Sequence, residues 1–215
     1  MVLADPRQIR SIIFDLDGTL YVSPQVAQRI QTTADELVAS TRGVSLAEGK
    51  SLLCAARRRQ SENEDEEPTL SRTLQELGID LADFHLLLQE KVQPERFLSN
   101  DPVLYALLDS LRDVCDLYVY TNNNLPLAQK ILALLGVEDL FDRVYTIEFD
   151  WQPKPSQQTL ERIMEDIGGP PDSFLFVGDR PHVDLKVADS LGVPTLQVTE
   201  TSDLLQIHKM LGIIP

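Results

Sequence analysis

The stretch Ser11-Ile12-Ile13-Phe14-Asp15-Leu16-Asp17-Gly18-Thr19-Leu20 places a short apolar run directly before two carboxylates, a glycine and a threonine. An uninterrupted apolar run of this kind predicts a strand that is buried on both faces, as in parallel sheets. In an extended chain Asp15 and Asp17 project to the same side, at the carboxyl end of that strand. Open α/β sheets bind their ligands at this edge. Two like charges held together there favour a divalent cation that prefers oxygen ligands, such as Mg²⁺.

The composition of the 215-residue chain limits its class. With 43% apolar residues the chain can bury a core, and no apolar run approaches the length of a membrane span. The N-terminus shows no export signal, so a cytoplasmic location is the expectation. The formal net charge of −15 argues against nucleic-acid polymers and anionic membranes as partners. Cys54 and Cys115 lack a C-x-x-C partner and are predicted to be buried, reduced thiols.

A helical insertion is predicted after the first strand. From Pro24 to about Leu98 apolar residues recur at helical spacing, with Gly43 and Gly78 as interruptions, and no segment has a convincing strand pattern. Because this insertion follows the strand that carries Asp15, it is expected to lie over the same sheet edge as a lid.

Two charged runs lie within the insertion. Residues 62–68 form an acidic run that ends in proline, and this run is predicted to be a solvated loop between helices. Residues 57–59 are consecutive arginines on a predicted helix, so they spread around its circumference. At most one or two of these arginines are expected to reach a ligand.

The chain beyond the insertion alternates between strand and helix patterns, after an amphipathic helix that begins near Pro102. Right-handed crossovers between such units predict a doubly wound parallel sheet, a Rossmann-like α/β core. The expected division is a core of residues 1–21 and 98–215 and a helical cap domain of residues 22–97. The predicted strands lie near 10–15, 116–121, 143–147, 173–178 and 194–198, and the predicted helices near 126–135, 156–167, 183–191 and 202–212.

Polar residues also follow three later strands or loops of the predicted core. Thr121-Asn122 follows the second strand, where a hydroxyl and a main-chain amide could hold a phosphate oxygen, although a cap for the next helix explains the pair equally well. Lys154 is followed by proline, and its ammonium group could neutralise carboxylates and a phosphate. The fourth strand stops at Gly178-Asp179, with Asp184 five residues later.

In chain order these motifs read Asp-x-Asp-Gly-Thr, Thr-Asn, Lys-Pro, and Gly-Asp followed by a further aspartate. The series resembles the four successive motifs of the haloacid dehalogenase-like hydrolase superfamily, and the insertion resembles the helical, C1-type cap found there. This resemblance implies a Mg²⁺-dependent phosphomonoesterase that acts on a small phosphorylated metabolite through an aspartyl-phosphate intermediate.

The resemblance also implies catalytic and substrate-binding residues. Asp15 matches the nucleophile, and Asp17 matches the general acid and base. Thr121 would bind a phosphoryl oxygen together with Asn122, while Lys154 would balance the charge of the site. Dehalogenation uses no carboxylate at the position of Asp17, so the resemblance favours phosphoryl transfer.

The metal ligands implied by the resemblance come from three strand ends. Mg²⁺ would be held by Asp15, the main-chain carbonyl of Asp17, and Asp179. Asp184 would support the metal's water shell or Lys154.

Some residues of the last motif depart from the pattern. Arg180 and Val183 replace residues that many relatives carry, so the surroundings of the metal are expected to differ. His182 in the same loop is interpreted as a solvated residue rather than a substrate contact. His85 and His208 fall in predicted helices and receive no role.

The motifs leave the substrate open. Tyr21, Thr121-Asn122 and Leu140-Phe141-Asp142 resemble the pyrimidine 5′-nucleotidase branch, but Gly18 stands where that branch often has asparagine and Leu127 where it often has histidine. Nucleotide monophosphates are the first expectation, followed by phosphoglycolate or a sugar phosphate. The alternatives are a sugar-phosphate mutase of the β-phosphoglucomutase type and a catalytically silent phospho-ligand-binding protein. The chain is expected to be a monomer or a dimer.

Overall fold

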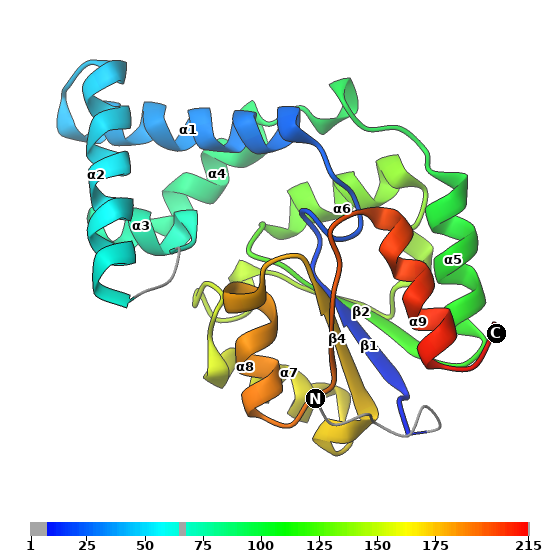
Figure 1. Ribbon diagram of the computed structural model, residues 1–215. Helices are drawn as coiled ribbons and strands as arrows, with labels where there is room; N and C mark the ends of the chain where they lie inside the picture. The colour runs from blue at the N-terminus through cyan, green and yellow to red at the C-terminus, as the bar shows by residue number, and fades with distance from the viewer. Residues whose placement is uncertain (1–7, 65–67, 215) are drawn as a thin grey trace.

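The computed structural model describes residues 8–64 and 68–214 of the chain. Its centre is a five-stranded parallel sheet with the strand order β3-β2-β1-β4-β5 (Figure 1). This sheet confirms the predicted parallel α/β core, with the strand that precedes Asp15 at its centre. The strands are β1 (Ser11–Phe14), β2 (Asp116–Tyr120), β3 (Arg143–Tyr145), β4 (Phe174–Gly178) and β5 (Thr195–Gln197).

The central strand β1 is buried on both faces, as predicted. Ile12 and Phe14 belong to one apolar cluster and Ile13 belongs to the other, because alternate side chains leave opposite faces of a strand. Phe14 is paired in register with Val119 of β2 and Val177 of β4. The carboxyl ends of these three strands therefore meet at one edge of the sheet.

Helices cover both faces of this sheet, which makes it doubly wound. The first apolar cluster includes buried residues of α5 (Pro102–Arg112), α6 (Leu125–Leu135) and α9 (Leu205–Met210). The second includes buried residues of α7 (Gln157–Ile167) and of the segment that contains α8 (Lys186–Ser190). Short 3-10 turns lie at Pro94–Arg96, Glu138–Leu140, Ile147–Phe149, Pro171–Ser173 and Thr201–Leu204.

Between β1 and β2 the described residues form helices and add no strand to the sheet, as predicted. Figure 1 shows α1 to α4 gathered at one end of the molecule, apart from α5, which lies against the core. We call α1 to α4 the insert. Its helices are α1 (Pro24–Arg42), α2 (Leu46–Glu64), α3 (Leu70–Glu76) and α4 (Leu81–Lys91).

Local sequence explains where the helices begin and end. The Ser23 hydroxyl accepts a hydrogen bond from the Val26 N–H at 3.3 Å and caps α1. Gly43 ends that helix with a φ of 64°, which a residue with a side chain rarely adopts. The cap of α6 is Asn124, whose Oδ1 accepts from the Leu127 N–H at 2.9 Å. The adjacent Thr121-Asn122 pair is therefore not used as the cap.

Two predicted helices have irregular first turns. The segment predicted as helix 183–191 begins as a π-helical turn, Pro181–Leu185, and becomes α8 only at Lys186. The Asp184 carboxylate accepts a hydrogen bond from the Arg180 N–H at 3.1 Å, so a side chain as well as the main chain holds this turn. The segment predicted as helix 202–212 begins as a 3-10 turn, Thr201–Leu204, and Glu200 and Asp203 form a reciprocal capping box at its start.

Two predictions for the insert need correction. Helix α2 continues to Glu64, into the run predicted as a loop, and residues 65–67 of that run lie outside the described residues. Cys54 is exposed, whereas Cys115 is buried as predicted. Helix α2 buries Leu53 and Ala56, and the neighbouring Cys54 lies off that face. Within the described segments, no helix has both the length and the apolar character to cross a membrane.

Candidate active site

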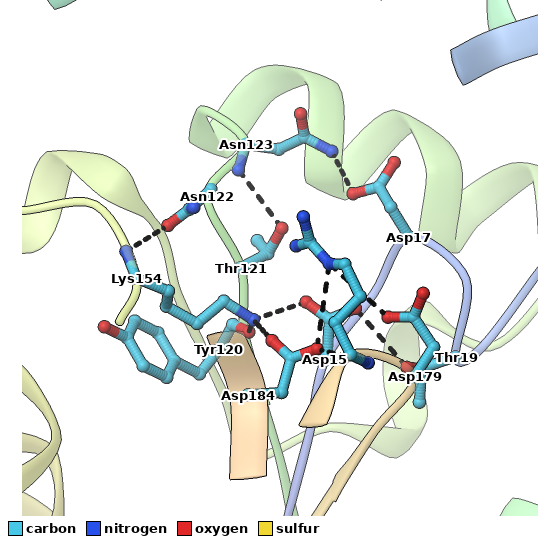
Figure 2. A network of polar contacts seen from close by, with 11 residues as sticks. Asp15, Asp17, Thr19, Tyr120, Thr121, Asn122, Asn123, Lys154, Asp179 and Asp184 are labelled. Atoms are coloured by element: carbon cyan, nitrogen blue, oxygen red, sulfur yellow. Dashed lines mark hydrogen bonds and ion pairs between the residues drawn. The ribbon is translucent and has the colours of Figure 1, made fainter. Parts of the chain in front are cut away.

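The carboxyl edge of the sheet brings the predicted site residues together (Figure 2). Asp15 follows β1, Thr121 follows β2 and Asp179 follows β4, so the three residues come from neighbouring strands. Lys154 reaches the same place from the loop before α7, and Asp184 reaches it from the π-helical turn. Contacts between these residues span most of the core sequence.

Lys154 is the centre of the charge network. Its ammonium group donates to Asp15 Oδ1 at 2.5 Å, to Asp184 Oδ1 at 2.7 Å and to the Tyr120 carbonyl at 3.0 Å. The three donors of the ammonium group thus have three acceptors. Burial disfavours the charged form, but the two carboxylates outweigh burial and hold the pKa of Lys154 above its usual value. Lys154 therefore remains a cation at neutral pH.

Asp15 is almost fully buried but lines a cavity. Its Oδ1 accepts from Lys154, and within the described residues its Oδ2 accepts only a long hydrogen bond of 3.3 Å from the Thr19 hydroxyl. Burial raises the pKa of Asp15 to about 7, and the Lys154 ammonium acts in the opposite direction. A ligand in the cavity can thus meet a carboxylate that is held mainly through one of its two oxygens.

Asp17 has partners of its own. The Asn123 amide donates to Asp17 Oδ2 at 2.6 Å, and the Tyr21 hydroxyl donates to Asp17 Oδ1 (Figure 2 shows the Asn123 contact). Burial raises the pKa of Asp17, although the hydrogen bond from Tyr21 opposes this effect. The carboxylates of Asp15 and Asp17 were expected to lie together because alternate residues of an extended chain project to the same side. In the structure β1 ends at Phe14 and a turn follows, so the chain is not extended through Asp17 and this argument does not apply there.

A different set of acids forms the compact carboxylate cluster. Oxygen atoms of Asp15, Asp179 and Asp184 all lie within 4.8 Å of one another. Asp179 Oδ1 is buried and has no hydrogen-bond partner in the described part of the chain, with Arg180 Nε 3.8 Å away. Burial raises the pKa of Asp179, and the charge of the neighbouring Arg180 acts in the opposite direction.

This cluster fits a hard divalent cation. Several carboxylate oxygens with one orphaned oxygen are the donor set that Mg²⁺ prefers. Gly18 leaves the space that the Asp179 carboxylate occupies, because a Cβ at position 18 would lie 2.5 Å from Asp179 Oδ2. The carboxylate of Asp17 lies outside the cluster, so its predicted main-chain contact to the metal stays a prediction.

Thr121 and Asn122 both line the cavity. The Thr121 hydroxyl is buried and accepts from the Asn123 N–H at 3.1 Å. The Asn122 side chain accepts from the Lys154 N–H at 2.8 Å, so it fixes the main chain that carries the ammonium group. The predicted contacts of both residues with a phosphoryl group stay predictions.

The cavity has a volume of about 590 Å³ and lies between the core and the insert. This size is typical of sites for small-molecule ligands. The side of the core contributes Asp15, Asp17 and Thr121. The insert contributes a mostly apolar wall, made of Pro24, Ala27, Ile30, Gln31, Arg57, Leu70, Ser71, Phe84, His85 and Leu88.

Two hydrogen bonds hold the insert to the core beside the cavity. The Asn124 amide, at the start of α6, donates to the His85 carbonyl on α4 at 2.8 Å. The guanidinium group of Arg72 on α3 donates to the Pro155 carbonyl at 2.6 Å. The second contact lies one residue beyond Lys154, so the insert touches the loop that carries the central cation.

Sequence reasoning missed several residues of the site. Tyr21 and Asn123 hold Asp17, and the weak signals for them were their places four residues after Asp17 and within an Asn-rich turn after β2. Of the three consecutive arginines 57–59, only Arg57 is among the described residues that line the cavity, in line with the expectation that at most one or two reach a ligand. His85, which received no role, also lines the cavity from the insert. His182 is exposed, as expected, at the cavity rim.

A comparison with known protein families matches residues 9–192 to the family described as haloacid dehalogenase-like hydrolase. The chain therefore belongs to the haloacid dehalogenase-like hydrolases. This membership agrees with the order of the four motifs along the sequence.

Solved structures with the same fold include three that span nearly the whole chain. An HAD phosphatase from Thermococcus onnurineus has 20% identity and a TM-score of 0.62, with 95% of this chain and 98% of that chain covered. YfnB from Bacillus subtilis, bound to magnesium, has 20% identity, a TM-score of 0.59 and coverages of 95% and 99%. A 2-haloacid dehalogenase from Pseudomonas syringae pv. Tomato DC3000 has 19% identity, a TM-score of 0.59 and the same coverages. These similarities concern the fold.

Proposed function

We propose that this hydrolase is a Mg²⁺-dependent phosphomonoesterase that acts on a small phosphorylated metabolite. The observation that carries the proposal is the network at the cavity floor, where buried Lys154 joins Asp15 to Asp184 while Asp15 still faces the cavity. A carboxylate is already a competent nucleophile when ionised, and it needs no separate base.

The proposed reaction has two displacements at phosphorus. First, an oxygen of Asp15 forms a bond to phosphorus, and the bond from phosphorus to the alcohol oxygen breaks. Asp17 gives its proton to the departing alkoxide. Then a water molecule loses a proton to Asp17 and attacks the aspartyl phosphate, which releases inorganic phosphate and restores Asp15. The hydrogen bonds from Tyr21 and Asn123 hold Asp17 in place for both proton transfers.

Mg²⁺ would be held by the cluster of Asp15, Asp179 and Asp184, with the predicted contact from the Asp17 carbonyl. The bound ion supplies positive charge that offsets the repulsion between a carboxylate and a phosphoryl dianion. The orphaned oxygen of Asp179 and the space left by Gly18 support this assignment.

Asp17 favours phosphoryl transfer over dehalogenation, although one of the similar structures is a 2-haloacid dehalogenase. A halide leaves as a stable anion and needs no proton, whereas an alkoxide must be protonated as it leaves. Burial raises the pKa of Asp17, and this shift increases the fraction of the acid form.

We further propose that residues 22–97 act as a cap domain on a core of residues 1–21 and 98–215. The lining of the cavity by both parts supports this division. A cap in this position would exclude water and contact the leaving group, while the core would hold the phosphoryl group.

The wider setting of the enzyme is part of the same proposal. The net charge of −15 supports a small substrate rather than a nucleic-acid polymer or a membrane. The free cysteines support a cytoplasmic location. Nucleotide monophosphates, phosphoglycolate and sugar phosphates are the proposed substrate candidates, and the protein would act as a monomer or a dimer.

Release of inorganic phosphate from p-nitrophenyl phosphate and from a panel of phosphorylated metabolites tests the proposal. Activity should disappear in excess chelator and return with Mg²⁺, while Ca²⁺ should inhibit because its coordination is larger and looser. Full turnover in chelator without added metal would contradict the metal assignment.

A further inference from the structure

The wall that the insert gives to the cavity carries an arginine without a direct carboxylate partner. Arg57 on α2 donates to Gln31 Oε1 at 3.3 Å. Its Nε is buried and has no hydrogen-bond partner within residues 8–64 and 68–214, and no ion pair is found for it there. A desolvated donor on a cation is costly unless a ligand pairs with it.

A neutral amide separates Arg57 from an acid of the insert. Gln31 Nε2 donates to Asp35 Oδ1 at 3.0 Å, while Gln31 Oε1 accepts from Arg57. The guanidinium group is thereby positioned without a direct ion pair. The sequence has 34 acidic residues and 19 lysines and arginines, so acids to pair with Arg57 are not scarce. The guanidinium group is thus held by a neutral amide, and Arg57 lines the cavity.

Two other basic groups near the cavity already have carboxylate partners, and a third is uncharged. Arg180 Nε lies 3.8 Å from Asp179 Oδ1 and 4.0 Å from Asp184 Oδ2. Lys154 has three acceptors. Burial lowers the pKa of His85 to about 4, so its imidazole is neutral at neutral pH. On the insert wall, among the residues that the structure describes, Arg57 is the cation left for a ligand.

We propose that Arg57 binds a second anionic group, a carboxylate or a phosphate, on the leaving group of the substrate. This inference rests on the proposed phosphomonoesterase function, because it takes the transferred phosphoryl group to lie beside Asp15 on the opposite side of the cavity. It narrows the substrate class to phosphate esters with an anion at each end. Nucleosides are neutral leaving groups and are disfavoured.

A series of matched phosphate esters tests this inference. ω-Carboxyalkyl phosphates with one to four methylene groups, and the corresponding alkanediol bisphosphates, are compared with alkyl phosphates of equal length. For at least one spacer length, kcat/KM of the wild-type enzyme should favour the doubly anionic ester on the order of ten- to hundredfold, the usual worth of a charge-assisted hydrogen bond.

Arg57→Gln should reduce this preference to about one, because glutamine keeps a polar side chain and removes the charge. Arg58→Gln is the matched control, since it removes the same charge from an exposed neighbour on α2 and should keep the preference. If Arg57→Gln loses kcat/KM equally for esters with a neutral leaving group and esters with an anionic one, Arg57 contacts the transferred phosphoryl group. That result would contradict the inference.

Other outcomes separate this inference from the proposed function. A wild-type enzyme that hydrolyses p-nitrophenyl phosphate but shows no preference within the ester series overturns only the role of Arg57, as does a higher kcat/KM for uridine 5′-monophosphate than for every anionic ester. If no ester is hydrolysed, the proposed function fails. Calorimetric titration with the same ester pairs then decides the inference, which requires tighter binding of an anionic ester that Arg57→Gln abolishes.

Discussion

Asp15 and Asp17 are two residues apart, yet their carboxylates have different surroundings. Burial raises the pKa of Asp15 to about 7, while the hydrogen-bonded ammonium group of Lys154 favours its ionised form. Asp17 accepts from the Tyr21 hydroxyl and the Asn123 amide. Burial and the charge of Asp17 raise the pKa of Tyr21 well above its usual value, so Tyr21 remains a donor. These surroundings suit a nucleophile and a proton carrier respectively.

Asp17→Asn should separate the two steps of the reaction. Asparagine cannot protonate an alkoxide, so turnover of an alkyl phosphate should fall about 10² to 10⁴-fold. With p-nitrophenyl phosphate, whose leaving group is stable without a proton, Asp15 should still be phosphorylated while hydrolysis stalls. Stopped-flow absorbance should record a burst of p-nitrophenolate with little further turnover. Steady turnover of the alkyl phosphate at the wild-type rate would remove Asp17 from the mechanism.

Gly18→Ala should weaken the metal site. A Cβ at Gly18 would meet Asp179 Oδ2 at 2.5 Å, so the Asp179 carboxylate must move. We expect Mg²⁺ affinity to fall about 10 to 100-fold, as it does when groups that orient metal ligands are changed. Calorimetric titration with Mg²⁺ measures the loss.

Gly43→Ala is the control for backbone strain. Gly43 has a φ of 64°, but a Cβ there would meet nothing within 4 Å. This variant should lose about 1 kcal/mol of stability and keep its Mg²⁺ affinity. Equal Mg²⁺ affinities for the two glycine variants would show that Asp179 does not depend on the space beside Gly18.

At the scale of elements, His85 on helix α4 makes the stability of the folded protein depend on pH. Burial lowers the pKa of His85 from 6.5 to about 4 in the folded protein, so the unfolded chain binds the proton more tightly. The stability that neutral His85 provides is complete above about pH 6.5 and is lost as the pH falls toward 4. This difference in pKa corresponds to about 3 kcal/mol at most.

His85→Gln should remove this part of the acid sensitivity. Urea unfolding at pH 7 and pH 4.5 should show a smaller loss of unfolding free energy for His85→Gln than for the wild type. Equal losses for the wild type and His85→Gln would show that His85 accepts a proton while folded.

The elements that sequence predicted best are those with a strong local pattern. The apolar run of β1 gave nearly the right bounds. The helical insertion was predicted to begin at Pro24 and to be interrupted at Gly43, which is where α1 begins and ends. The π-helical turn at Pro181–Leu185 was not predicted, because it depends on where the Asp184 carboxylate finds its partners. Local periodicity contains no information about such tertiary contacts.

At the scale of the whole molecule, the same limit applies to the site. The parallel topology brings the ends of β1, β2 and β4 together, so Asp15, Thr121 and Asp179 could be predicted to meet. The positions of Arg57 and His85 depend on how the insert packs over that edge. This packing rests on contacts far apart in the sequence, so the wall that faces the leaving group required the structure.

The central claim is that Asp15 becomes phosphorylated, and one measurement tests it most directly. The enzyme with Mg²⁺ is mixed with ³²P-labelled p-nitrophenyl phosphate, quenched in acid within milliseconds and digested for peptide mapping. Asp17→Asn, in which the second step should stall, gives the stronger signal. We expect an acid-stable, hydroxylamine-sensitive label on Asp15 and no label in Asp15→Asn. A label on another residue, or hydrolysis by Asp15→Asn at the wild-type rate, would contradict the account.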